Sequence, residues 1–153
     1  MEKINQQRFY ITDPTEEKDS FGSFISYLLK GVDVPDPLPR RYREFDVLRT
    51  KLVEKWPGIY IPPLPRKKAI GNKTQDTVDT RYLQLNRFCK LVGKNDLLYN
   101  SPETKAFLSN TSNVEKAITA VEKETTQQML TRYKGIYTIP GVNIKIIIYN
   151  LGF

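Results

Sequence analysis

Residues 40–45, Arg-Arg-Tyr-Arg-Glu-Phe, bring three guanidinium groups and two aromatic rings together just after a proline-rich stretch. A guanidinium presents a rigid fork of donors that can bind a phosphate through two parallel hydrogen bonds. The ring beside it offers an apolar face for a sugar-like or inositol ring. Arg41 and Tyr42 therefore predict a site for a phosphorylated ring. The structural alternative is that Arg40 and Arg43 are solvated and that the two rings fill the core where a strand meets a helix.

The composition indicates one globular domain with an excess of positive charge. The chain has 153 residues, of which 39% are hydrophobic and 27% charged, and its formal net charge is +7. This length allows one domain of common size and a linker or tail. Residues 61–94 contain eight basic and two acidic residues, which is nearly all of the excess. We therefore expect an anionic partner, either a nucleic acid or an acidic membrane face.

Missing residue types and segments exclude several classes of protein. The sequence contains no histidine, which removes the commonest general base, the usual triads and most zinc sites. Cys89 is the only cysteine, so no internal disulfide can form. We expect no enzymatic activity, no metal and no cofactor. Residues 1–7 lack the apolar core of a signal peptide, and no apolar run approaches the roughly 20 residues of a membrane-spanning helix, so we expect a cytosolic protein.

The first part of the chain predicts three antiparallel strands. Residues 7–12 alternate between apolar and polar side chains, and the Asp-Pro pair at 13–14 is expected to end this strand. A charged loop at 15–19 then leads to a second strand at 21–30. The third strand, at 34–42, contains three prolines, so it can lie only at a sheet edge or a bulge.

Helical periodicity follows. Phe45, Leu48 and Leu52 share one face of a helix that begins near Glu44 and ends at Trp56. A second helix is expected from Asp79 or Thr80 to about Gly93. Four of its residues share one face, which should be buried: Arg81, Leu85, Phe88 and Val92.

The remaining pattern is helical and then strand-like. Ser101 and Pro102 resemble a capped start of a short helix. Residues 113–133 are amphipathic, and Thr125 with Gln128 could form a capping box, so one helix and two helices with a break are equal alternatives. Residues 136–153 are hydrophobic and strand-like, and we assign them no role.

A proline-stiffened arm lies between the first two helices. Residues 61–68, Ile-Pro-Pro-Leu-Pro-Arg-Lys-Lys, should be extended and end in cations. The loop that follows has Ile70 as its one sizeable apolar residue. The arm also fits the Pro-x-x-Pro-x-basic pattern bound by SH3 grooves, through Pro62 and Pro65, so an SH3-binding adaptor is an alternative function. A nucleic-acid-binding domain is another alternative, permitted by the charge but supported by no recognised module.

Three motifs in this order resemble the phox-homology (PX) domain, and specifically the PX domains of sorting nexins. They are Arg-Arg-Tyr-x-Glu-Phe at 40–45, Pro-Pro-Leu-Pro-Arg-Lys-Lys at 62–68 and Arg-x3-Leu-x2-Phe at 81–88. The resemblance covers roughly residues 7–109 and implies an α+β fold, a three-stranded antiparallel meander packed against a helical subdomain.

The resemblance also suggests boundaries along the chain. Residues 1–6 would be a leader, 7–110 a PX-like domain, and 111–153 a helical linker with a hydrophobic tail. The segment 114–133 resembles the start of the region that joins PX to a BAR-like coiled coil, and dimerisation is expected if a longer helical region exists.

In that family the headgroup of phosphatidylinositol 3-phosphate lies between the strand-helix junction, the arm and the following helix. By position, Arg41 would bind the 3-phosphate and Tyr42 would stack beneath the inositol ring. Lys67 would neutralise the 1-phosphate, and Arg81 would hydrogen-bond the 4- and 5-hydroxyls. The residues expected to contact the membrane follow the arm: Lys68, Ile70 and Lys73.

The implied function is a peripheral module of the early endosomal membrane in endosomal sorting and protein trafficking. Its partners would be phosphatidylinositol 3-phosphate and an anionic membrane surface. The chain departs from the family at Arg43, where serine is usual, which removes a plausible helix cap but no phosphate ligand.

Overall fold

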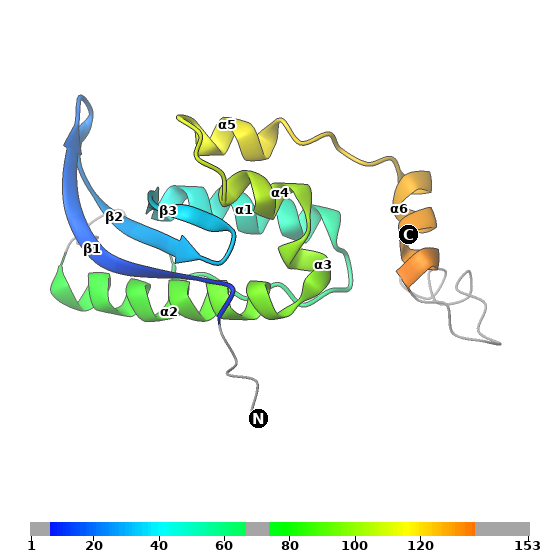
Figure 1. Ribbon diagram of the computed structural model, residues 1–153, viewed down its shortest axis with the longest axis horizontal. Helices are drawn as coiled ribbons and strands as arrows, with labels where there is room; N and C mark the ends of the chain where they lie inside the picture. The colour runs from blue at the N-terminus through cyan, green and yellow to red at the C-terminus, as the bar shows by residue number, and fades with distance from the viewer. Residues whose placement is uncertain (1–6, 67–73, 137–153) are drawn as a thin grey trace. The chain divides into compact units, whose positions relative to one another are not determined.

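The three strands form one antiparallel sheet in the order β1-β2-β3 (Figure 1). In this computed structural model residues 7–66 and 74–136 are described. The strands are β1 (Phe9–Asp19), β2 (Gly22–Gly31) and β3 (Val34–Arg41). The sheet with the helices that follow it is the α+β meander and helical subdomain that the sequence predicted.

β1 is longer than predicted. The expectation that the Asp-Pro pair at 13–14 ends the strand was wrong, as was the expectation of a loop at 15–19. Pairing with β2 is irregular between Thr12 and Thr15 and then resumes to the end of the strand. Asp13 has a φ of 50°, and the chain forms a bulge there. A residue in a bulge is left out of the ladder, so Pro14 does not have to donate a backbone hydrogen bond. The hairpin therefore extends to a tight turn at Gly22, whose φ of 130° favours glycine.

β3 is an edge strand, as its prolines required. It pairs only with β2 within the described residues. Val34 and Leu38 are buried, whereas the prolines at 35, 37 and 39 are exposed. Because these prolines are two residues apart, their nitrogens lie on the same side of the strand, which can be the unpaired side.

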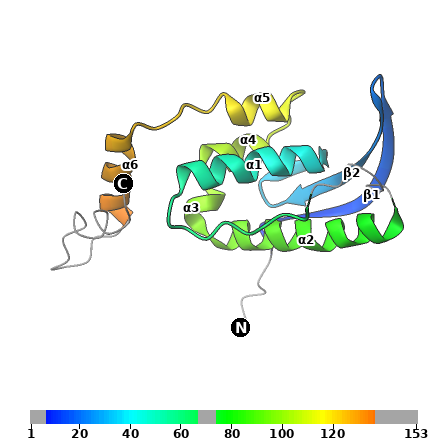
Figure 2. The same ribbon diagram turned by 180° about the vertical axis from the view of Figure 1, so that it is seen from behind.

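Five helices follow in the first compact unit, Met1–Val121. Within the described residues they are α1 (Tyr42–Lys55), α2 (Gln75–Lys94), α3 (Asp96–Tyr99), α4 (Pro102–Phe107) and α5 (Val114–Thr119). Figures 1 and 2 show α1 and α4 between α2 on one side and α5 on the other. Phe45 of α1 is fully buried and meets Phe88 of α2 and Phe107 of α4 edge-on, at centroid distances of 6.3 and 4.8 Å.

α2 begins earlier than its periodicity suggested. It starts at Gln75 after Thr74 as N-cap, and not at Asp79 or Thr80. Arg81 consequently lies in the second turn of the helix and not at its head. The predicted buried face is confirmed, because α2 buries Arg81, Leu85, Phe88 and Val92.

The capped start predicted at Ser101 is confirmed. The Ser101 side chain accepts a hydrogen bond from the Thr104 amide at the start of α4. α5 belongs to the first compact unit, which reaches Val121, whereas the sequence placed this helix in a linker.

A second unit, Glu122–Phe153, contains α6 (Thr126–Ile136). The Thr125 amide donates to Gln128 Oε1 at 2.8 Å, and the Gln128 amide donates to Thr125 Oγ1 at 3.2 Å. The capping box therefore forms, and of the two alternatives the one with a break is correct. Residues 137–153 lie outside the described residues.

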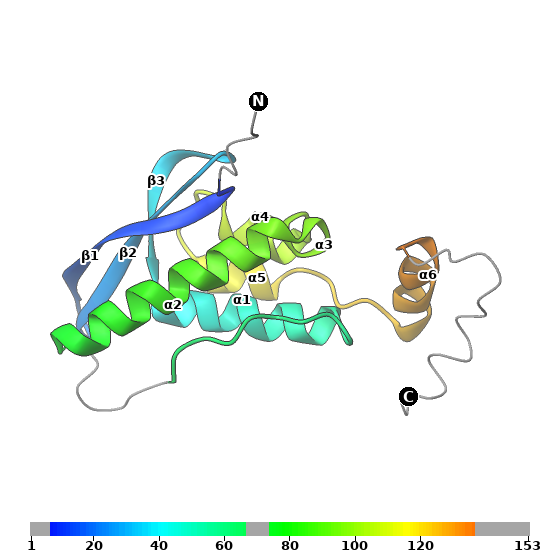
Figure 3. The same ribbon diagram turned by 90° about the horizontal axis from the view of Figure 1, so that it is seen from below.

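α2 runs along β1, and one of its side chains bonds to the strand (Figure 3). Asn86 Oδ1 accepts the Ile11 amide at 2.9 Å, and Asn86 Nδ2 donates to the Ile11 carbonyl at 3.1 Å. A side-chain amide thus satisfies both backbone groups of a strand residue in the way that a neighbouring strand would.

We expect Asn86→Ala to lower the free energy of unfolding by about 2 kcal/mol, because two partly buried backbone groups of Ile11 lose their partner. Urea denaturation followed by circular dichroism measures this change. Gln84→Ala, on the exposed face of the same helix, is the matched control and should be nearly neutral. Equal stability of the two variants would contradict the role given to Asn86.

Candidate functional site

Tyr42 is the point where the three motifs meet. It is the first residue of α1, directly after β3. Its hydroxyl donates to the carbonyl oxygen of Pro65 in the arm. The guanidinium of Arg81 lies over its ring, 4.6 Å from the centroid. The structure therefore brings together the strand-helix junction, the end of the arm and α2, as the resemblance to PX domains implied.

Arg41 extends from the same junction toward the β1–β2 hairpin. Its Nη1 donates to Asp19 Oδ2 at 3.1 Å, and its guanidinium stacks on the Phe24 ring at 3.6 Å. The side chain is still 43% exposed. The sequence did not indicate Asp19 or Phe24, because it predicted a loop at 15–19 and a loop has no register with the second strand.

Arg40 has a different role from its neighbour. It is 3% exposed, which contradicts the alternative in which it is solvated. Its Nε donates to the Phe107 carbonyl at 3.0 Å, and its Nη2 donates to the Ser109 carbonyl at 2.6 Å. Burial lowers the pKa of Arg40 from its usual value. The side chain thus joins β3 to the carboxyl end of α4, where helix carbonyls lack partners.

Glu44 caps α1. Its Oε2 accepts the Arg41 amide at 2.7 Å, so the helix does not depend on the serine that the family usually has at position 43. Burial raises the pKa of Glu44, and the Arg41 amide and the Arg40 charge oppose this rise. Arg43 instead is exposed and pairs with Glu115 at 2.9 Å.

The arm lies against α1. Arg49 Nε donates to the Pro62 carbonyl at 2.8 Å, and Tyr42 bonds to the Pro65 carbonyl as described above. Pro62 and Pro65 are both buried. An SH3 groove binds through those two prolines, so their burial against the domain argues against the SH3 alternative.

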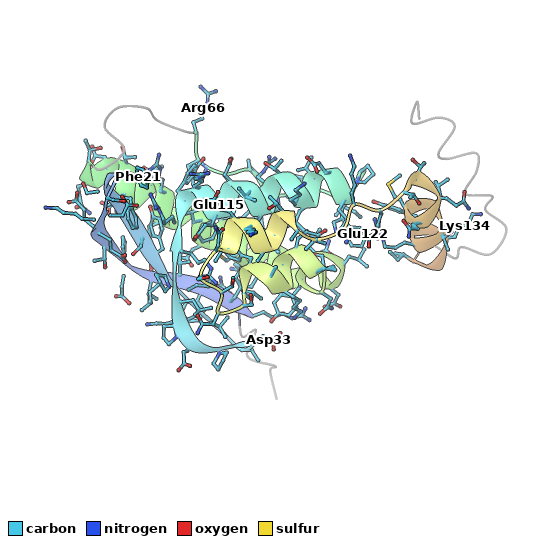
Figure 4. All side chains as sticks on the ribbon, turned by 90° about the horizontal axis from the view of Figure 1, so that it is seen from above. Phe21, Asp33, Arg66, Glu115, Glu122 and Lys134 are labelled. Atoms are coloured by element: carbon cyan, nitrogen blue, oxygen red, sulfur yellow. The ribbon has the colours of Figure 1, made fainter. Side chains whose placement is uncertain are left out.

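The last described residue of the arm is Arg66, which is exposed (Figure 4). The other predicted ligands of the arm and loop lie outside the described residues: Lys67, Lys68, Ile70 and Lys73. The site therefore rests here on Arg41, Tyr42 and Arg81.

A buried tyrosine lies near Arg81. Tyr27 of β2 has no exposed surface and is opposite Arg40 in the sheet. Burial raises the pKa of Tyr27, and the nearby charge of Arg81 acts in the opposite direction. Arg81 itself is 8% exposed. Tyr27 is thus a buried neighbour of the guanidinium that lies over the Tyr42 ring.

The described residues contain neither a metal-ion cluster nor a membrane-spanning helix. No group of three or more His, Cys, Asp or Glu residues there is placed to hold a metal ion. No described helix is long and apolar enough to cross a membrane.

Comparisons with known proteins identify relatives of this chain. Residues 36–111 match the PX domain family. Mouse (Mus musculus) sorting nexin-18 is 41% identical over 73 residues, which is 46% of this chain and 12% of that protein. Sorting nexin-30 of Xenopus tropicalis is 29% identical over 140 residues, which is 81% of this chain and 31% of that protein. The chain thus spans less than a third of the length of these curated relatives.

A solved structure shows the same fold. The X-ray structure of a designed CISK-PX domain aligns with a TM-score of 0.57 and 25% sequence identity. The alignment covers 66% of this chain and 97% of that domain.

The two neighbouring arginines give a prediction about stability. Arg40→Ala should lower the free energy of unfolding by about 2–4 kcal/mol, because buried carbonyls of Phe107 and Ser109 lose a charged donor. Arg41→Ala should change it by less than about 1 kcal/mol, since its ion pair is partly exposed. Thermal unfolding of the two variants is the measurement. A larger effect for Arg41→Ala than for Arg40→Ala would contradict this division of roles.

Proposed function

The chain belongs to the PX domain family, and on that premise we propose that it is a membrane-targeting module that binds phosphatidylinositol 3-phosphate. The observation that carries this proposal is the meeting of three segments at Tyr42. Its ring contacts Arg81, its hydroxyl bonds to Pro65, and Arg41 precedes it in the chain. A cationic fork, an aromatic face and the start of a basic loop are therefore available to one phosphorylated ring.

Arg41 is the proposed ligand of the 3-phosphate. It is partly exposed and already paired with a carboxylate, so its guanidinium is held in a position where an anion can reach it. An exposed ion pair of this kind contributes about 0–1 kcal/mol. A phosphate offers more charge and a bidentate geometry. The headgroup should therefore displace Asp19 from Arg41 without a large cost.

Tyr42 and Arg81 are the proposed contacts of the inositol ring. Arg81 lies over one face of the Tyr42 ring, so an inositol that also accepts hydrogen bonds from Arg81 must stack on the part of that same face that the guanidinium does not cover. Arg81 is nearly buried and lies beside that ring. A guanidinium held in this way suits hydrogen bonds to the hydroxyls of a bound inositol better than an ion pair with a mobile phosphate. A phosphate at the 4- or 5-position would have to fit against this buried group, which favours a lipid phosphorylated at the 3-position alone.

Lys67 is the proposed partner of the 1-phosphate, since it follows Arg66 at the end of the arm. The arm is fixed to α1 at Pro62 and Pro65, so the residues directly after it start from a defined place. Lys68, Ile70 and Lys73 would then contact the membrane surface, with each cation near it contributing on the order of 1 kcal/mol.

The biological setting we propose is peripheral attachment to early endosomal membranes in endosomal sorting. The sorting nexin relatives support it, because two of them match this chain with 41% and 29% identity. A single headgroup site with micromolar affinity supplies about 8 kcal/mol. Dimerisation through a longer helical region would raise the overall affinity by avidity.

Arg41→Ala is the first test of this function. It should abolish measurable binding to liposomes that contain phosphatidylinositol 3-phosphate, because an unmade charged bidentate contact costs about 2–5 kcal/mol. Co-sedimentation with liposomes, each containing one phosphoinositide, measures both the loss and the lipid preference. Arg43→Ala removes an exposed arginine two residues away and is the matched control.

Three results would contradict the assignment: undiminished binding by Arg41→Ala, an equal loss for Arg43→Ala, or a parent chain that prefers single-stranded nucleic acid to every liposome. The last result would instead support the nucleic-acid alternative.

Asp19→Asn tests the competition for Arg41. We expect the affinity for soluble inositol 1,3-bisphosphate to increase about 2–5-fold, since the variant removes a competing charge worth up to about 1 kcal/mol. Isothermal titration calorimetry gives this affinity. Asp96→Asn removes an exposed carboxylate that pairs with Arg8 instead, and it controls for net charge. Weaker headgroup binding by Asp19→Asn would show that Asp19 orients Arg41 and does not compete for it.

A further inference from the structure

Phe21 is the most exposed large hydrophobic residue among those described, with 97% of its surface accessible. It lies in the turn between β1 and β2, where Figure 4 shows it at one end of the sheet and Asp33 at the opposite end. Its side chain contributes no burial to the core, so the fold of this chain does not account for an aromatic residue there.

One carboxylate connects Phe21 to the proposed headgroup site. Asp19 Oδ1 accepts the Phe21 amide at 2.9 Å, while Asp19 Oδ2 accepts Arg41 Nη1 at 3.1 Å. Arg41 also stacks on Phe24 of the same hairpin. The turn that carries Phe21 is therefore held directly beside the guanidinium that would bind the phosphate.

The other proposed membrane contacts directly precede α2 in the sequence. In Figures 1 and 3 the β1–β2 turn and the amino-terminal end of α2 lie at the same end of the first unit. A lipid headgroup bound at Arg41 remains attached to its bilayer, so the bilayer surface must pass close to Arg41. A fully exposed ring beside that headgroup faces the lipid interface.

We infer that Phe21 inserts into the lipid interface and acts as an apolar membrane anchor separate from the loop that contains Ile70. This inference rests on the proposed binding of phosphatidylinositol 3-phosphate. The sequence predicted Ile70 as the one sizeable apolar residue of the membrane-contacting loop, so Phe21 adds a second apolar contact.

The charges near the turn indicate what kind of contact this is. The end of β1 carries Glu16, Glu17 and Asp19 but only one cation, Lys18. An anionic bilayer gives this segment no net electrostatic attraction. The contact must then come from burial of the Phe21 ring, so its contribution should depend little on salt, unlike that of exposed cations.

A tryptophan at position 21 tests insertion directly. Phe21→Trp should show a blue-shifted emission on vesicles with phosphatidylinositol 3-phosphate and quenching by brominated acyl chains. Val32→Trp is the matched control, because Val32 is 67% exposed and lies in the turn at the other end of β2. The natural Trp56 is 4% exposed and contributes a constant background. An emission that stays unshifted on vesicles that Phe21→Trp does bind would overturn the inference.

Truncation of the ring measures its contribution. Phe21→Ala should bind 3-phosphate vesicles about 10-fold more weakly, with the same ratio at low and high salt, while its affinity for soluble inositol 1,3-bisphosphate stays unchanged. Val32→Ala should match the parent in both assays. Equal vesicle binding by Phe21→Ala and the parent would refute insertion and leave the headgroup site intact. A parent chain that binds neither the soluble headgroup nor the vesicles would refute the proposed function and, with it, this inference.

Discussion

The buried guanidinium of Arg40 is the interaction on which the site depends. It donates to two carbonyls at the end of α4, and so fixes the last residues of β3 against the helical part of the domain. Side chains alternate along a strand, so an inward Arg40 requires Arg41 to point the other way. Glu44 then caps the helix that starts at the next residue. One buried charge thus sets the direction of the neighbouring arginine, which is the one available to a ligand.

Much of the fold followed from local patterns. The stripe of Phe45, Leu48 and Leu52 predicted α1, and all three are buried. The predicted end of β1 was wrong. An Asp-Pro pair usually stops a strand, but here a bulge with Asp13 at positive φ allows pairing with β2 to continue. A local pattern does not contain the partner strand, and the partner decides whether a bulge is tolerated.

The sequence predicted which residues belong to the site, but not which of the two arginines is buried and which is available to a ligand. The resemblance to PX domains placed Tyr42 and Arg81 in one site, and the structure has them in contact. No local pattern distinguishes Arg40 from Arg41, because the carbonyls that bind the buried arginine lie 67 and 69 residues away from Arg40 in the sequence. The proline arm shows the same limit, because a stiff extended segment can serve a groove in another protein or pack on its own domain. Hydrogen bonds from Tyr42 and Arg49 hold the arm against its own domain.

The two outer strands of the sheet are closed to strand addition by different means. Along β3, three prolines in alternate positions remove the amide donors with which a further chain would pair. On β1, Asn86 already bonds to both backbone groups of Ile11. A second copy of the chain would find few free ladder partners at these positions, so edge-to-edge aggregation is discouraged. A protein that binds by extending this sheet would have to pair away from Ile11 and from the prolines of β3.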